Sequence, residues 1–216
     1  MIVILITLKK GLIVSQRIHN KSLILEHIQI MTKAQTKLKI GEAILDLKSD
    51  SKVKVLSALK ILETIGDKTI LSTLIEVLYK KDAPLSKAVL ELIANIQDQE
   101  IAEDLVDFIR KENDPIIRHQ LLTTIWNSKL DFSEYLAEFV CLASEGDFMQ
   151  ALECLTIIEN LSGPFEEHQL LEAQLYLKDY AEDLSERELR KHQIISEISL
   201  FIKDQNEGID ADLLLD

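Results

Sequence analysis

A helical sequence pattern returns about every 31 residues along the chain, and this repetition restricts the possible folds more than any other feature. Each repeat opens with a residue whose side chain or backbone suits a helix N-cap, where it accepts hydrogen bonds from the free N–H groups of the first turn. The predicted N-caps are Ser51, Asp82, Asn113 and Ser144. Pro84 and Pro115 follow two positions after their caps, where a helix tolerates a missing N–H.

The apolar positions repeat in the same way, and they predict two helices in each unit. In the first helix, three registers recur: Leu59, Leu90, Leu121 and Leu152; Leu62, Ile93, Thr124 and Leu155; and Ile65, Ile96 and Ile158, with Asn127 as the exception. A turn that carries Asp67, Asp98 or Lys129 then leads to the second helix. Its repeated positions are Ile70, Ile101, Phe132; Leu74, Leu105, Leu136; Ile75, Val106, Ala137; Val77, Phe108, Phe139; and Leu78, Ile109, Val140. In a chain that is 47% hydrophobic, chance would not make all fifteen apolar.

Helix pairs of this kind cannot bury their apolar faces alone, so they must stack. The sequence therefore predicts an all-α fold, an α-solenoid of antiparallel helix pairs, and the alternative is a bundle without repeats. We expect residues 38–48 to close an N-terminal cap, residues 31–165 to form the array, and residues 166–203 to cap its other end with helices over 169–180 and 189–202. Residues 204–216 read as an acidic tail, either frayed or docked onto a partner or onto the chain's own groove.

Residues 1–30 fit neither a signal peptide nor a membrane span. Eight mostly apolar residues precede Lys9 and Lys10, whereas a signal peptide has its basic residues first and a membrane span needs about 20 apolar residues. The segment is interpreted either as a short β-hairpin or as sequence upstream of translation starting at Met31. An intact mass of the native protein that includes residues 1–30 would exclude the second interpretation.

Composition points to a cytoplasmic protein with protein partners. The net charge of -13, from 37 acidic against 24 basic residues, argues against binding nucleic acid and favours basic or mixed-charge partners. Cys141 and Cys154 are interpreted as small buried hydrophobes in a reducing compartment. No membrane partner is expected, and these patterns specify no oligomeric state.

Motifs for catalysis or cofactor binding are missing from the sequence. There is no glycine-rich phosphate loop, no metal-spaced cluster and no nucleophile elbow. Trp126 is expected in the core or an interface, and His119 on the surface without a catalytic role. We therefore expect no catalytic residue, no metal and no cofactor.

Three stretches resemble HEAT repeats of the short bacterial kind, which include lyase-type repeats. They are Asp50-Ser51-Lys52-Val53-Lys54, Leu62-Glu63-Thr64-Ile65-Gly66-Asp67-Lys68-Thr69-Ile70 and Asn113-Asp114-Pro115-Ile116-Ile117-Arg118. The resemblance covers residues 36–162. The second unit departs from the pattern at Ser86-Lys87 and Gln97, and the third lacks Gly-Asp. Tetratricopeptide and ankyrin signatures are absent.

The resemblance implies a protein-interaction scaffold. Iron-dependent hydroxylases of this class use His-Glu dipeptides, which the chain lacks. Glycosylases of the class use a basic concave face, which the net charge opposes. Bilin lyases share the fold only. An accessory or regulatory subunit that docks through apolar or capping-helix surfaces is the main alternative, and an enzyme of the lyase or glycosylase type is a further one.

Second helices of this family usually line the concave surface, where the resemblance places an acidic row. Glu76, Asp107 and Glu138 share one register, and Ser72, Glu103 and Glu134 lie one turn earlier, beside Asp104 and Tyr135. Such a row favours a basic or amphipathic peptide segment, with Tyr79 and Arg110 at its rim. The alternatives are an ordinary solvated helix face for the carboxylates and capping contacts at helix ends for Tyr79 and Arg110.

Overall fold

A computed structural model of the protein describes residues 32–65, 68–182 and 188–213, and within them it contains helices and no strand. A helix over residues 32–47 comes first. It is followed by α2 (Lys52–Ile65), η1 (Lys68–Ile70), α3 (Leu71–Leu78), α4 (Ala83–Asn95), α5 (Ile101–Lys111), α6 (Pro115–Trp126), η2 (Ser133–Tyr135), α7 (Leu136–Glu145), α8 (Phe148–Asn160), α9 (Glu167–Glu182) and α10 (Leu189–Leu213). The predicted all-α class is confirmed. The predicted hairpin in residues 1–30 and the turn residue Asp67 lie outside the described residues.

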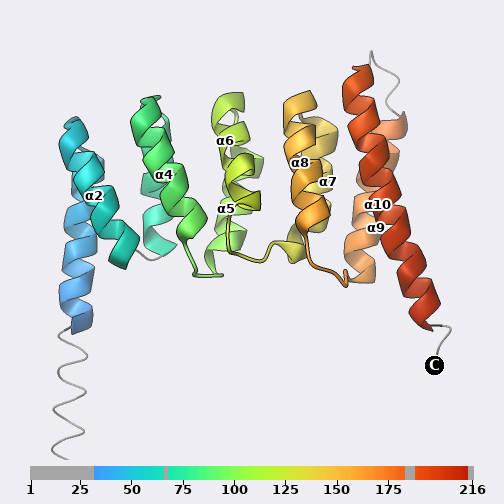
Figure 1. Ribbon diagram of the computed structural model, residues 1–216, viewed down its shortest axis with the longest axis horizontal. Coiled ribbons are helices and arrows are strands. Elements are labelled where there is room, and N and C mark those ends of the chain that lie inside the picture. The colour runs from blue at the N-terminus through green and yellow to red at the C-terminus, as the bar shows by residue number, and fades with distance from the viewer. Residues whose placement is uncertain (1–31, 66–67, 183–187, 214–216) are drawn as a thin grey trace, which may run out of the picture.

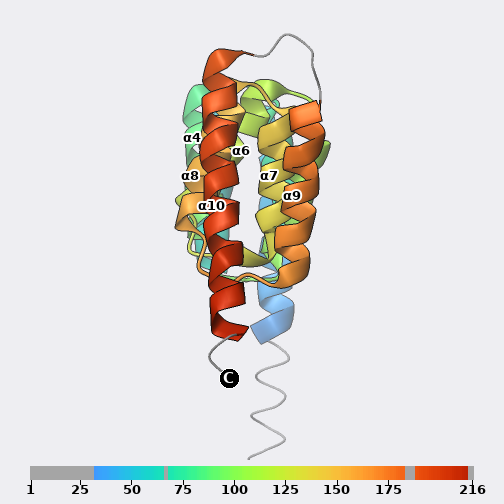
Figure 2. The same cartoon turned by 90° about the vertical axis from the view of Figure 1, so that its right-hand side faces the viewer.

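The helices lie in two layers. Figure 1 shows α2, α4, α6, α8 and α10 side by side in a row, and each packs on the next. Figure 2 looks at the C-terminal end of this row and shows α7 and α9 in a second layer behind it. Contacts also join α3 to α4, α5 to α6, α7 to α8 and α9 to α10.

Apolar side chains of both layers form one core. The fifteen repeated positions of the second helices are all buried except Phe108, which is half-buried. The helix over residues 32–47 contributes Ile40, Ala43 and Leu47 to the same core, which agrees with the predicted N-terminal closing helix. The 3.6-residue period therefore fixes which face of each helix is buried.

The helix N-caps differ from two of the predicted positions. Asp82 caps α4 as predicted, and its carboxylate accepts a hydrogen bond from Leu85 N at 3.1 Å. Asp114 rather than Asn113 caps α6, and Asp147 rather than Ser144 caps α8. Ser144 instead lies in the last turn of α7, where its hydroxyl donates to Val140 O at 2.9 Å. Ser51 directly precedes α2, as predicted.

These corrections arise because the repeat lengthens along the chain. The first helices begin at Lys52, Ala83, Pro115 and Phe148, so successive units contain 31, 32 and 33 residues. A fixed step of 31 falls behind by one residue and then by three, and it places the half-buried Leu90 and Leu152 in a core register. The structurally equivalent positions are Ala58, Val89, Leu121 and Cys154, all at most 1% exposed.

Lysine side chains connect consecutive units along the edge where these N-caps lie. Lys52 pairs with Asp82 at 2.9 Å, and Lys81 pairs with Asp114 at 2.8 Å. The hydrogen bond from each lysine is the largest effect that lowers the pKa of each carboxyl. The stabilisation from these two caps is therefore present above the ordinary aspartate pKa, and it is lost as the pH falls through the lowered values.

The C-terminal helices are longer than predicted. α9 extends two residues beyond each end of the predicted segment 169–180, and α10 continues past Lys203 to Leu213. Residues 204–213 of the predicted acidic tail are therefore helical. The physical reason is that this stretch contains no proline, and the single Gly208 costs only about 1 kcal/mol in a helix.

Two glycines give a matched test of this helix packing. A Cβ on Gly41, inside the helix over residues 32–47, would meet nothing within 4 Å, so we expect Gly41→Ala to stabilise the protein by about 0.5 to 1 kcal/mol. A Cβ on Gly146 would lie 2.8 Å from Leu142 O and 2.6 Å from Gln150 Oε1, so Gly146→Ala should destabilise it by about 1 to 3 kcal/mol. Urea unfolding of both variants checks the opposite signs, and a stabilised Gly146→Ala protein would contradict the described packing.

Candidate functional site

The predicted acidic residues lie on the second layer of helices, but they do not form one uniform row. Glu76 on α3 pairs with Lys48 at 3.3 Å, and Asp107 on α5 pairs with Lys111 at 2.7 Å. The hydrogen bond from Lys111 is the main effect that lowers the pKa of Asp107. Glu76 and Asp107 are thus already partly neutralised within the chain.

Unpaired carboxylates gather instead around one aromatic ring, that of the half-buried Tyr135. We call this group the Tyr135 cluster, and it comprises Glu103, Asp104, Glu134, Tyr135 and Glu138. Burial raises the pKa of the Tyr135 phenol, and so do the negative charges of the four acidic members. The four carboxylates form no ion pair within the described residues, and all except the half-buried Glu138 are exposed.

Two elements bring the Tyr135 cluster together. Glu103 and Asp104 occupy the first turn of α5, where an acidic residue is stabilised by the helix dipole. The other members come from η2 and the start of α7. The Tyr135 ring lies 6.3 Å from the ring of the buried Phe132, which in turn packs edge-on against Phe139. The apolar side of the Tyr135 ring is therefore held by the core.

The predicted rim residues do not join this cluster. The Tyr79 hydroxyl donates to Glu112 Oε2 at 2.5 Å, so this side chain makes a contact at the helix ends, which was the alternative interpretation. Arg110 is exposed, and its charge lowers the pKa values of Cys141 and Tyr176, which places it beside α7 and α9. Ser72 is exposed on α3.

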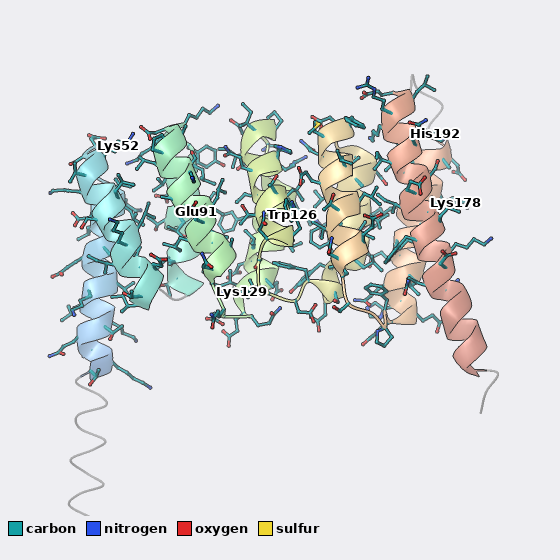
Figure 3. The ribbon with its side chains drawn as sticks, in the orientation of Figure 1. Lys52, Glu91, Trp126, Lys129, Lys178 and His192 are labelled. Atoms are coloured by element: carbon teal, nitrogen blue, oxygen red, sulfur yellow. The ribbon has the colours of Figure 1, made fainter. Side chains whose placement is uncertain are left out.

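A polar contact between α6 and α8 has no counterpart in the sequence predictions. Trp126 Nε1 donates to Glu153 Oε2 at 3.1 Å, and His119 Nδ1 lies 3.8 Å from Glu153 Oε1. The Trp126 ring is 44% exposed on α6 (Figure 3), so it is not the core residue that the sequence predicts. The signal in the sequence is the spacing of seven residues between His119 and Trp126, which puts both on one helix face.

The structure offers little for catalysis in its described part. Cavities of about 550 Å³ and 350 Å³ are lined by α4 with α6 and by the segment after α6 with the end of α8. No group of three or more His, Cys, Asp or Glu side chains is arranged to hold a metal in the described ranges. Burial raises the pKa of Cys141 to about 11 and raises that of Cys154 further, so both buried thiols stay protonated near neutral pH.

No family model, no curated protein and no solved structure matches this chain. Among the described residues, no helix combines the length and the apolar character needed to cross a bilayer.

Proposed function

We propose that the protein is a HEAT-like α-solenoid that acts in the cytoplasm as a non-catalytic scaffold and binds a basic or amphipathic protein segment on the Tyr135 cluster. The solenoid is supported by the two layers of helices and by the equivalent buried positions Ala58, Val89, Leu121 and Cys154 in successive units. Stacked helix pairs of this kind present extended surfaces to partners.

The observation that carries the binding proposal is the set of four unpaired carboxylates around a half-buried tyrosine. Their summed negative potential attracts Lys and Arg side chains and speeds encounter with a basic partner. Tyrosine is among the residues that contribute most to binding energy at interfaces, because its ring is large and rigid and its hydroxyl forms hydrogen bonds. The proposed ligand is therefore a helix with lysines on one face and an apolar residue that packs on the Tyr135 ring.

A fluorescent peptide of lysines and leucines in an amphipathic pattern provides a defined probe. Replacement of three cluster carboxylates, in the variant Glu103→Gln, Glu134→Gln, Glu138→Gln, should weaken peptide binding by about tenfold or more, which corresponds to about 1.4 kcal/mol. Fluorescence anisotropy measures this change. Binding should also weaken between low salt and about 1 M salt, where the screening length falls to about 3 Å.

The matched control removes the same number of charges elsewhere. Glu63, Glu91 and Glu159 are exposed residues of α2, α4 and α8, in the other layer. The variant Glu63→Gln, Glu91→Gln, Glu159→Gln has the same net charge as the cluster variant and should bind the peptide within about twofold of the original protein. If both triple variants lose affinity equally, net charge alone attracts the peptide and the Tyr135 cluster is not a binding site.

A further inference from the structure

The two ends of the helix row carry apolar surfaces that no other helix covers. Each inner helix of the row in Figure 1 has a neighbour on both sides, whereas the helix over residues 32–47 with α2, and α9 with α10, have neighbours on one side only. A terminal pair of a repeat protein normally exposes a polar outer face. Here both terminal pairs expose leucine, so these surfaces need a different explanation.

At the N-terminal end, the exposed apolar residues flank a groove. Leu38 is 69% exposed and Leu45 is 72% exposed, and their spacing of seven places them on one stripe of the helix opposite the buried Ala43. Val53 on α2 is 79% exposed. The groove between the two helices has a volume of about 570 Å³ and is lined from both sides, with Ile61 of α2 in its wall.

At the C-terminal end, a second stripe points away from the molecule. Leu171 and Leu175 on α9 are 51% and 61% exposed, and their spacing of four continues to Lys178. Figure 3 shows Lys178 directed away from the row, and Figure 2 shows that no helix lies in front of α9 and α10. Leu200 on α10 is also 55% exposed. This stripe is a ridge of the kind that fills a groove between two helices.

The two ends carry opposite charges. The helix over residues 32–47 and α2 together contain six lysines against three acidic residues, although the whole chain has a net charge of -13. In contrast, α9 and α10 together contain nine acidic against four basic residues. Opposite charges favour the approach of one end to the other, and like charges disfavour contact between two identical ends.

We propose that the N-terminal end of one copy of this protein docks on the C-terminal end of a second copy, so that the helix row continues from chain to chain. The Leu171 and Leu175 ridge of one copy fills the groove between the helix over residues 32–47 and α2 of the other, and Leu38 and Leu45 cover its side. Such a head-to-tail interface uses two different surfaces, so it adds copies in a line and does not close at two.

Light scattering of the full chain tests the association directly. The mass should rise from one chain of 24.6 kDa to two and more as the concentration increases from about 1 µM to about 1 mM. A variant with a blocked N-terminal end, Leu38→Glu with Leu45→Glu, and a variant with a blocked C-terminal end, Leu171→Lys with Leu175→Lys, should each remain at the mass of one chain. All four leucines are exposed, and circular dichroism of each variant checks that the helices are intact.

Mixing the two blocked variants separates head-to-tail docking from the other arrangements. Each retains one free end of the opposite kind, so an equimolar mixture should form a complex of two chains and no larger species. A mixture that stays at the mass of one chain overturns the proposal, and so does a blocked variant that still associates alone. Ile116→Glu, at an exposed site of α6 within the row, is the matched control and should associate like the original protein. A monomeric Ile116→Glu protein would also overturn the proposal.

Discussion

Replacement of Glu112 by alanine should lower the free energy of unfolding by about 2 kcal/mol, because this carboxylate joins two units at the helix ends. Glu112 is only 7% exposed, and it follows α5 directly. Its Oε2 accepts the hydroxyl of Tyr79, and its Oε1 accepts the backbone N–H of Asp114 at 2.7 Å. Arg118 also donates to the Glu112 carbonyl. Removal of the side chain leaves both donors without their acceptor, and urea unfolding measures the loss.

Tyr79→Phe is the matched control for this contact. It removes one hydroxyl from a half-exposed ring and should cost about 1 kcal/mol in the original protein. In the Glu112→Ala background the same change should cost almost nothing, because its partner is already gone. A Tyr79→Phe effect that is equally large in both backgrounds would show that the hydrogen bond does not couple the two residues.

The same contact has a pH signature. The hydrogen bond to Glu112, together with burial and nearby carboxylates, raises the pKa of Tyr79 from 10.0 to about 12. Since the folded pKa is above the unfolded one, this stabilisation is complete below pH 10.0 and is lost as the pH rises to about 12. In Glu112→Ala, the Tyr79 phenol should therefore ionise at a lower pH, which ultraviolet absorbance detects as an earlier tyrosinate band.

Periodicity in the sequence predicted the helices and their buried faces, because the spacing of apolar residues is a local property. The prediction of N-caps was less accurate. A fixed step of 31 residues led to Asn113 and Ser144, whereas the true caps Asp114 and Asp147 follow from units that grow by one residue each. A pattern search with one period cannot detect such growth, but the Asp residues themselves are stronger cap candidates than Ser144 in the last turn of a helix.

The candidate site was predicted only in part, because pairing between side chains depends on the fold. The sequence placed Glu76 and Asp107 in the same row as Glu138. Their partners Lys48 and Lys111 lie 28 residues earlier and one turn later, and only the structure shows which of these lysines reach the carboxylates. Glu112 was not singled out because a glutamate after a helix is common, and its burial depends on Tyr79 of the preceding unit.

Phe139→Ala should cause the largest loss of stability, about 3 to 5 kcal/mol, because the ring is fully buried and packs edge-on against Phe132. Phe108 occupies the same register one unit earlier but is half-buried, so Phe108→Ala removes the same atoms from a less enclosed place. It should cost about half as much. Urea unfolding midpoints of the two variants compare burial at identical chemistry. Equal losses would mean that the two positions are equally enclosed in solution, contrary to the described structure.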